Sequence, residues 1–250
     1  MDRIDIVITT YNRLSYLRMI LDCIENQNCT NDFRYIFSDA GSTDGTQEFL
    51  KNRYAKSEEH IVILPKGKVQ LPLNESWDAA LQFVDSDPFI VTDDDVLVYG
   101  KDFIIRMRDK LFSVRKHNID VLLPRCPRFT NAILNDQRNK HKIIDEVFIV
   151  GMVGTHFRMC RKSVLNATGT TFGPGRREHW FMRRIHENNI SAGFWLQLPL
   201  LDIGAVTQGY DSNKPKDPVK FKPLQWGKEF LETGWSSTFT EDHKLVGIDI

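Results

Sequence analysis

Short apolar runs alternate with segments of helical periodicity through the first half of the chain. The first run covers residues 4–9, and after it Leu14, Leu17, Leu21 and Ile24 recur at the spacing that predicts one face of an amphipathic helix. Further strands are predicted at residues 33–37, 61–64, 89–92 and 119–123, with helices at 77–84 and 103–114. Strands that alternate with helices favour an α/β domain with a largely parallel sheet.

Three polar clusters directly follow predicted strands of this half. They are contained in ITTYNR at 8–13, DAGSTDGT at 39–46 and VTDDDVLV at 91–98. Open α/β sheets bind their ligands outside the carboxyl ends of the strands. We therefore expect the three clusters to gather at one edge of the sheet and to form a ligand site there.

The second half is less regular. Residues 124–145 are rich in arginine and lysine and show little apolar periodicity, so we expect a long loop or lid. Strands are predicted at 147–153 and 194–198, on either side of a helix at 177–187. From residue 211 the chain is rich in proline and lysine, and we interpret residues 211–250 as a C-terminal extension.

Length and charge narrow the classes of protein and partner. A chain of 250 residues can bury one sizeable core, since single cores stop growing at about 250–300 residues. Lysine and arginine together number 33, as do aspartate and glutamate, so the formal net charge is zero. No overall field favours a nucleic acid or an anionic membrane as partner, and any anionic ligand must be held by local charge.

Targeting segments are not evident. No apolar stretch approaches the roughly 20 residues that a membrane span needs, and the N-terminal stretch carries Asp2, Arg3 and Asp5. The four cysteines show neither a Cys-x-x-Cys pair nor zinc-ligand spacing. We expect a protein without a membrane span in a reducing, cytoplasmic setting.

The acidic cluster at the end of the fourth strand is the sharpest chemical feature. Asp93, Asp94 and Asp95 are bracketed by apolar, strand-favouring residues, and adjacent carboxylates repel one another unless a positive charge neutralises them. A hard divalent cation, Mn²⁺ or Mg²⁺, fits this need and completes its shell with substrate phosphates. The alternative for this segment is a solvated acidic turn.

The cluster after the second strand predicts a tight turn before a helix. Gly41 and Gly45 permit backbone conformations that other residues avoid, and such a turn can expose backbone N–H groups at a helix start. A turn rich in glycine and hydroxyl residues is also ordinary after a strand, so this signal is weak by itself.

Together, the three motifs resemble those of the family 2 glycosyltransferases, in their order and spacing. The resemblance covers roughly residues 4–210 and is closest over the first 100. It implies the GT-A fold, a Rossmann-like, mostly parallel mixed sheet flanked by helices in a single domain. On this basis residues 1–210 form the catalytic domain, with a nucleotide-sugar half at about 1–123 and an acceptor half at about 124–210.

The resemblance assigns roles to the first three motifs. Thr9 and Tyr11 would line the nucleotide pocket, with Tyr11 packing on the base. Asp39 would accept a hydrogen bond from the base, which favours uracil and a UDP-sugar donor. The acidic cluster fits the family's Asp-x-Asp motif, with Asp93 near the ribose and Asp95 on the metal, while Asp94 shares in nucleotide or metal binding.

The resemblance also implies a general base at the start of a helix in the second half. In GPGRREHWF at 173–181, Glu178 occupies that place, and His179 stands where relatives have a second acid. A base there would deprotonate the acceptor hydroxyl opposite the leaving nucleotide, and direct displacement inverts the anomeric centre. Without the family, an acid stabilised by the helix dipole is the simpler explanation for Glu178.

Several further side chains are candidates for the metal or the diphosphate. Relatives often supply a third metal ligand from a late histidine before a hydrophobic residue and glycine. Asp202 is the best match to that pattern, and His156 competes with it. Lys66 and Arg177 could neutralise a diphosphate, although surface lysine and arginine are ordinarily solvated.

Two other classes of function stay open at this level. A nucleotidyltransferase that makes a nucleotide-sugar would share the α/β fold and the acidic metal site. It would also have a glycine-rich loop directly after the first strand, whereas residues 11–13 contain no glycine. In a nucleotide- or glycan-binding module without turnover, we would expect the acidic residues of the site to be replaced by other residue types. The acceptor is expected to be a hydroxyl, on a glycan in the leading interpretation, with a nucleic acid among the alternatives.

Overall fold

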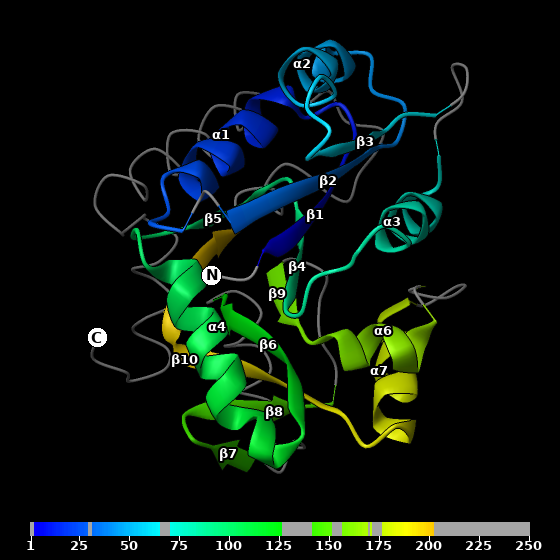
Figure 1. The fold of residues 1–250 in the computed structure, drawn as a ribbon. Coiled ribbons are helices and arrows are strands. Elements are labelled where there is room, and N and C mark those ends of the chain that lie inside the picture. Colours follow the sequence, from blue (N-terminus) through cyan, green and yellow to red (C-terminus); the bar gives the residue numbers. More distant parts are fainter. Residues whose placement is uncertain are drawn as a thin grey trace, which may run out of the picture.

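One mixed sheet organises the protein in the computed structural model (Figure 1). The structure describes residues 3–29, 32–65, 71–126, 142–151, 157–169, 171 and 177–202. The strand order is β3-β2-β1-β4-β9-β6-β10-β8-β7, and β5 pairs with β10 off this path. The strands are β1 (Ile4–Thr10), β2 (Phe33–Asp39), β3 (Ile61–Ile63), β4 (Phe89–Asp93), β5 (Val96–Val98), β6 (Ile119–Arg125), β7 (Lys142–Ile144), β8 (Val147–Val150), β9 (Phe157–Cys160) and β10 (Ser191–Asp202).

Strand direction confirms the expected α/β sheet. β1 pairs in parallel with β2 and β4, β2 pairs in parallel with β3, and β6 pairs in parallel with β10. β9 runs antiparallel to both β4 and β6, so these two strands point the same way as β1. The carboxyl ends of β1, β2 and β4 therefore meet at one edge of the sheet.

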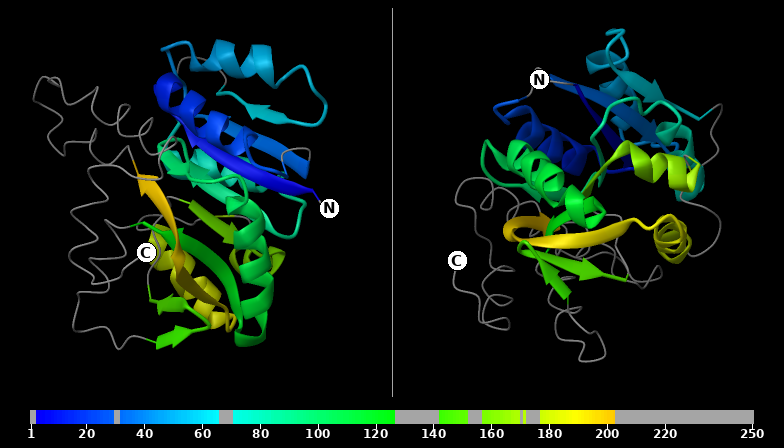
Figure 2. Two further views of the ribbon diagram at one scale, coloured as in Figure 1. Left: turned by 90° about the vertical axis from the view of Figure 1, so that its left-hand side faces the viewer. Right: turned by 60° about the horizontal axis from the view of Figure 1, so that its bottom comes forward.

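Helices cover both faces of the sheet. They are α1 (Leu14–Glu25), α2 (Thr46–Arg53), α3 (Leu73–Leu81), α4 (Phe103–Val114), α6 (Lys162–Thr168) and α7 (Arg177–Glu187), with a short 3₁₀ helix η2 (Arg115–His117). The apolar residues of α1, α2 and α4 share one core cluster with Ile4, Ile6 and Ile8 of β1. Those of α3, α6 and α7 share a second cluster with Val7, on the opposite face of the same strand. Figures 1 and 2 show the sheet between these two layers of helices.

The second half differs from the expectation in three places. The proposed loop at 124–145 is shorter, because β6 continues to Arg125 and β7 begins at Lys142 to form a hairpin with β8. β9 and α6 were not predicted. β10 runs for 12 residues instead of the expected five at 194–198, pairing with β6 and β8 near its start and with β5 at its end (Figure 2).

The two proposed halves are joined through one sheet. β5 belongs to the nucleotide half and β10 to the acceptor half, yet Val96 pairs with Asp202 and Val98 with Leu200. Residues 203–250, including the proposed C-terminal extension, lie outside the described residues. In the ranges that the structure does describe, no helix combines the length and apolar character needed to cross a bilayer.

A buried ion pair anchors β1 at the end of the sheet away from the polar clusters. Asp5 is fully buried and accepts hydrogen bonds from Arg34 Nε at 2.8 Å and Nη2 at 2.7 Å, and from the backbone N–H groups of Asp85 and Ser86. Burial alone would raise the pKa of Asp5, but the hydrogen bonds from Arg34 and these amides outweigh it and lower the pKa below 3.8.

We expect Asp5→Asn to lower the free energy of unfolding by about 3 kcal/mol, because it leaves the Arg34 guanidinium without its buried partner. A depressed native pKa stabilises the fold above the ordinary value and loses that contribution as pH falls through the native value. The free energy of unfolding of wild type, measured with urea, should therefore fall below about pH 4. In the variant, the free energy of unfolding should depend less steeply on pH. The double variant with Arg34→Met should recover part of the loss, and equal stability of wild type and Asp5→Asn would contradict the role of the pair.

Candidate functional site

The register of the sheet brings the three polar clusters together. Thr9 of β1 pairs with Ser38 of β2 on one side and with Asp93 of β4 on the other. Thr10 is the register partner of Asp39. The ends of the three motifs thus lie side by side at the carboxyl edge of parallel strands, which is where sheets of this type bind ligands.

Hydrogen bonds between side chains and backbone join the first two motifs. Asn12, in the left-handed region with φ 51°, donates its N–H to Ser42 Oγ at 2.8 Å and accepts from Thr43 N–H through Oδ1 at 2.7 Å. Asp44 Oδ2 accepts the N–H of Leu14 at 2.9 Å, at the start of α1. The turn after β1 and the turn after β2 therefore form one rigid unit.

The Asp39 carboxylate is held inside this unit with one oxygen unused. Oδ1 accepts hydrogen bonds from the backbone N–H of Gly41 at 2.9 Å and of Ser42 at 2.8 Å, and from Gln47 Nε2 at 3.0 Å. Oδ2 is buried and has no hydrogen-bond partner among the residues that the structure describes. A buried carboxylate oxygen without a donor is costly, so this atom is prepared to accept a hydrogen bond from a ligand.

The sequence indicates that this turn can expose backbone N–H groups at a helix start, but four of its N–H groups are engaged within the protein. The N–H groups of Gly41 and Ser42 are bonded to Asp39, that of Thr43 to Asn12 and that of Thr46 to Asp44. Gly41 and Gly45 do adopt positive φ, at 103° and 93°, and Gly45 directly precedes α2. The glycines therefore serve to fold the turn around Asp39.

Tyr11 and Thr9 differ in their access to solvent. The Tyr11 side chain is 38% exposed, an unusual position for a large aromatic ring, whereas Thr9 is buried at the end of β1. An exposed aromatic ring directly after β1 can stack on a planar heterocycle.

Arginine and threonine hold the acidic turn. Arg13 Nη1 lies 3.1 Å from Asp94 Oδ1 and also pairs with Asp95 Oδ2, while Thr10 Oγ1 donates to Asp94 Oδ2 at 2.6 Å. The three charged side chains are largely enclosed, with 20% of Arg13, 4% of Asp94 and 10% of Asp95 exposed. Asp94, proposed as a nucleotide contact, thus has both oxygens engaged by the protein, while Asp93 is only half-buried.

The electrostatics of the turn favour added positive charge. Burial and, after it, the neighbouring Asp95 carboxylate together raise the pKa of Asp94 to about 7, although Arg13 opposes both. For Arg13, burial lowers the pKa, but the two carboxylates outweigh it and the net shift is upward. The neighbouring carboxylates of this turn therefore destabilise each other's charged form, and added positive charge would relieve that repulsion.

The donor set at this edge suits a hard divalent cation. Asp93 and Asp95 offer oxygen ligands, and the backbone of Asp202 is brought alongside by its pairing with Val96; the Asp202 side chain is outside the described part. Among described side chains, no group of three His, Cys, Asp or Glu lies close enough to hold a metal unaided. One or two carboxylates with substrate phosphates are the usual set for Mg²⁺, so the residues fit such an ion.

The helix that carries Glu178 is anchored against the same strands. Thr171 Oγ1 donates to Asp78 Oδ2 of α3 at 2.8 Å, a few residues before α7. Phe181 of α7 lies 4.6 Å from the guanidinium of buried Arg158, whose register partner Val91 is two residues before Asp93. Phe181 of α7 therefore packs against β9, which pairs with β4, the strand that ends in the acidic turn. Arg177, Glu178 and His179 are in this helix, and their side chains are outside the description.

Two predicted candidates lie outside the described residues, and three contributors were not predicted. Lys66 and His156 fall in undescribed segments. Thr10, Arg13 and Gln47 were missed as site residues, although Arg13 is the only cation within the first motif. A charge count of that motif against the three acids would have pointed to it.

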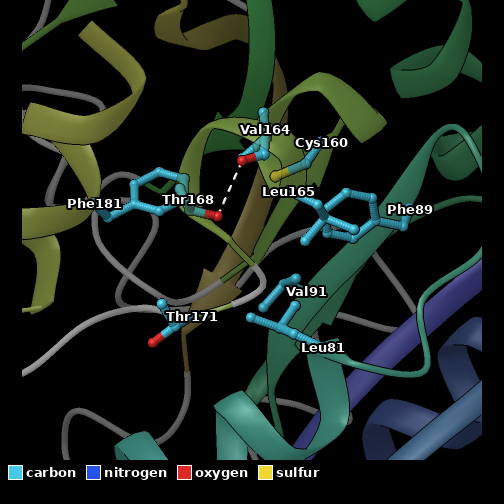
Figure 3. A pocket seen from close by; sticks show the side chains of 9 residues that line it. All are labelled: Leu81, Phe89, Val91, Cys160, Val164, Leu165, Thr168, Thr171 and Phe181. Atoms are coloured by element: carbon cyan, nitrogen blue, oxygen red, sulfur yellow. Dashed lines mark hydrogen bonds between the residues drawn. The ribbon is translucent and has the colours of Figure 1, made fainter. Parts of the chain in front are cut away.

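A small apolar cavity under α7 is not a ligand site. Figure 3 shows its lining side chains, which come from α3, β4, β9, α6 and α7, with Thr171 at the margin. Its volume is about 10 Å³, room for about one water molecule, and its walls are mostly apolar. We interpret it as a packing gap.

Comparison with known proteins agrees with this geometry. The family model described as Glycosyl transferase family 2 matches residues 5–173. No curated protein matches the chain in sequence. Similar folds are nevertheless found among solved structures.

The mannosyltransferase PcManGT from Pyrobaculum calidifontis, in complex with GDP-Man and Mn²⁺, is 17% identical with a TM-score of 0.63, over 92% of this chain and 70% of that one. S. aureus TarS 1-349 in complex with UDP-GlcNAc is 16% identical with a TM-score of 0.54, over 79% and 55%. A further structure of S. aureus TarS is 13% identical with a TM-score of 0.58, over 94% and 44%. At these identities the likeness shows a shared fold.

Proposed function

The chain belongs to glycosyl transferase family 2, and from this premise we propose that it is a metal-dependent inverting enzyme that moves a sugar from a UDP-sugar to an acceptor hydroxyl on a glycan. The observation that carries the proposal is the Asp39 carboxylate beside the acidic turn, with its buried, unused Oδ2. Mn²⁺ or Mg²⁺ is the proposed cofactor. The complexes of PcManGT with GDP-Man and Mn²⁺ and of TarS with UDP-GlcNAc are consistent with a nucleotide-sugar donor.

The hydrogen-bond state of Asp39 favours uracil. Uracil presents a single imide N–H flanked by carbonyls, which matches one free oxygen. Guanine presents two adjacent donors and is best met by a carboxylate with both oxygens available, whereas Oδ1 already accepts three hydrogen bonds. Cytosine would direct a ring nitrogen acceptor at the carboxylate. The exposed ring of Tyr11 would stack on the base.

The acidic turn would hold the diphosphate end of the donor. Asp93 and Asp95 are the proposed protein ligands of the cation, with Asp202 as the third candidate. When bound, the cation supplies positive charge that stabilises the departing diphosphate. Asp94 positions the turn through Thr10 and Arg13. Lys66, Arg177, His156 and His179 are further candidates for contact with the donor or the metal.

Glu178 is the proposed general base. Its carboxylate would accept the proton of the acceptor hydroxyl while that oxygen forms a bond to the anomeric carbon and the bond to the diphosphate oxygen breaks. Attack from the face opposite the leaving group inverts the anomeric centre. The position of Glu178 at the start of α7, which packs against β9 next to β4, supports this role.

Two alternatives make different predictions. A nucleotidyltransferase would release pyrophosphate from a nucleoside triphosphate and a sugar phosphate, whereas a glycosyltransferase releases a nucleoside diphosphate. A binding module without turnover would retain the nucleotide but would not hydrolyse any donor. Mass spectrometry of the products from a panel of nucleotide-sugars, and from nucleoside triphosphates with sugar phosphates, each with Mn²⁺, separates the three.

Nucleotide binding tests the donor class directly. We expect calorimetry with UDP, dTDP, GDP and CDP to show tightest binding for UDP in Mn²⁺, with GDP and CDP at least about tenfold weaker and all binding strongly reduced in EDTA. The control is Asp39→Asn, in which a side-chain amide replaces the carboxylate that would face the imide N–H of uracil. This variant should lose the preference for UDP. Equal affinity for all four nucleotides would contradict base recognition by Asp39.

A further inference from the structure

Gln47 holds Asp39, the residue proposed to recognise the base, through its side chain. Its Nε2 atom donates to Asp39 Oδ1 at 3.0 Å, while the backbone N–H groups of Gly41 and Ser42 donate to the same oxygen. Gln47 lies in the first turn of α2 and is partly buried. The nitrogen of its amide must face the carboxylate, because two oxygen acceptors would repel each other. Asp39 therefore fixes the direction of this amide.

The Gln47 amide has a hydrogen-bond donor to spare. A primary amide nitrogen carries two N–H groups, and the bond to Asp39 uses one of them. Within the described part of the chain, the Gln47 side chain makes no other hydrogen bond. The second N–H is therefore available to a ligand that already contacts Asp39.

Gln47 approaches Asp39 from the side away from the acidic turn. Its helix α2 packs against β2, whereas the acidic turn follows β4, on the other side of β1 (Figure 1). The proposed contacts to ribose and diphosphate are at the acidic turn, so the ribose end of a bound base would point toward β4 and its opposite edge toward α2. In uracil, the group next to the imide N–H on that opposite edge is the O4 carbonyl.

We propose that Gln47 is a second residue that recognises the base, donating its spare N–H to O4 of uracil while Asp39 Oδ2 accepts the imide N–H. This role rests on the proposed function and deepens it, because it names the residue that reads position 4 of the base. Uracil presents an acceptor beside a donor, the complement of Gln47 beside Asp39. Cytosine presents an amino group at position 4 and an acceptor beside it, so a donor would meet a donor and an acceptor an acceptor.

A purely supporting role for Gln47 leads to a different result. If Gln47 only steadied the Asp39 carboxylate, its removal would weaken every uracil nucleotide by the same factor, whatever atom stands at position 4. If Gln47 donates to O4, the loss depends on that atom. The coupling between one residue and one ligand atom, measured as in a double-mutant cycle, separates the two roles.

The experiment is a calorimetric titration of the full chain in Mn²⁺ with UDP, 4-thio-UDP and 2-thio-UDP, in wild type and in Gln47→Met. Sulfur is a weak hydrogen-bond acceptor, so each thio substitution removes most of the bond at one carbonyl. We expect wild type to bind UDP at least about fivefold more tightly than 4-thio-UDP, and Gln47→Met to bind these two within about twofold of each other. The ratio of UDP to 2-thio-UDP affinity should be the same in both proteins, because the carbonyl at position 2 is on the ribose side.

Gln82→Met is the matched control, since Gln82 is an exposed glutamine at the end of α3, next to Phe83, whose carbonyl accepts from Arg34 near Asp5. It should bind all three nucleotides as wild type does, and thermal unfolding checks that both variants fold. The same ratio of UDP to 4-thio-UDP affinity in wild type and Gln47→Met overturns the role of Gln47 and leaves the proposed function standing. Equal affinity of wild type for UDP and 4-thio-UDP overturns that role without any variant. Absence of nucleotide binding by wild type would refute both.

Discussion

Replacing Asp95 with asparagine should abolish metal-dependent nucleotide binding. The substitution keeps the shape of the side chain but removes the negative charge that a hard cation requires. We expect the dissociation constant for UDP in Mn²⁺ to rise at least about 100-fold, equivalent to about 2.7 kcal/mol, and to approach the value measured in EDTA. The measurement is isothermal titration calorimetry of UDP binding to wild type and to Asp95→Asn, each in Mn²⁺ and in EDTA.

The matched control is Asp22→Asn, which removes a carboxylate from the exposed side of α1. It should bind UDP as wild type does in Mn²⁺ and in EDTA. Asp95→Asn also releases one contact of Arg13, so circular dichroism and thermal unfolding must show that the variant is folded. Wild-type affinity of a folded Asp95→Asn for UDP in Mn²⁺ would exclude Asp95 as a ligand.

The strands and helices that could be predicted are those whose buried positions form a recognisable hydrophobic pattern in the local sequence. β1, β2 and β4 are buried on both faces in a parallel sheet, which produces short apolar runs, and α1 and α4 each bury one stripe. Their order then fixes the edge at which the polar motifs meet. The resemblance to family 2, drawn from those motifs, is confirmed by the match over residues 5–173.

The missed elements depend on distant partners. β5 has three residues, and its pairing with β10 joins segments about 100 positions apart, which no local pattern encodes. β9 contains Arg158, a buried charge that interrupts the apolar run. In α2 only Thr46 and Leu50 are buried, so no stripe appears.

The candidate site likewise contains features that could be predicted from the sequence and features that could not. The positions of Asp39 and Asp93 follow from strand ends, so their approach could be expected from the sequence. The free oxygen of Asp39 could not, because it depends on which N–H groups the turn directs at Oδ1. The pairing of Arg13 with Asp94 and Asp95 also requires the three-dimensional arrangement, because about 80 residues separate the partners.

Glu178→Gln should separate binding from transfer. Glutamine keeps the size and much of the hydrogen bonding of the side chain but cannot accept the acceptor proton. We expect the transfer rate to fall at least about 100-fold, within the range that general bases contribute. The affinity for UDP in Mn²⁺ should stay within about twofold of wild type, because the proposed mechanism puts Glu178 on the acceptor side of the sugar. Rates of sugar transfer and calorimetric binding of UDP are the two measurements.

Glu187→Gln at the other end of α7 is the matched control, since Glu187 is half exposed and pairs with Arg184 on the helix surface. It makes the same chemical change in the same helix and should leave transfer intact. Near-normal transfer by Glu178→Gln would refute the proposed base, whereas loss of UDP binding in that variant would place Glu178 on the donor. Because α7 packs against Arg158 through Phe181, a rigid-body shift of the helix would affect both variants, so their difference isolates the carboxylate.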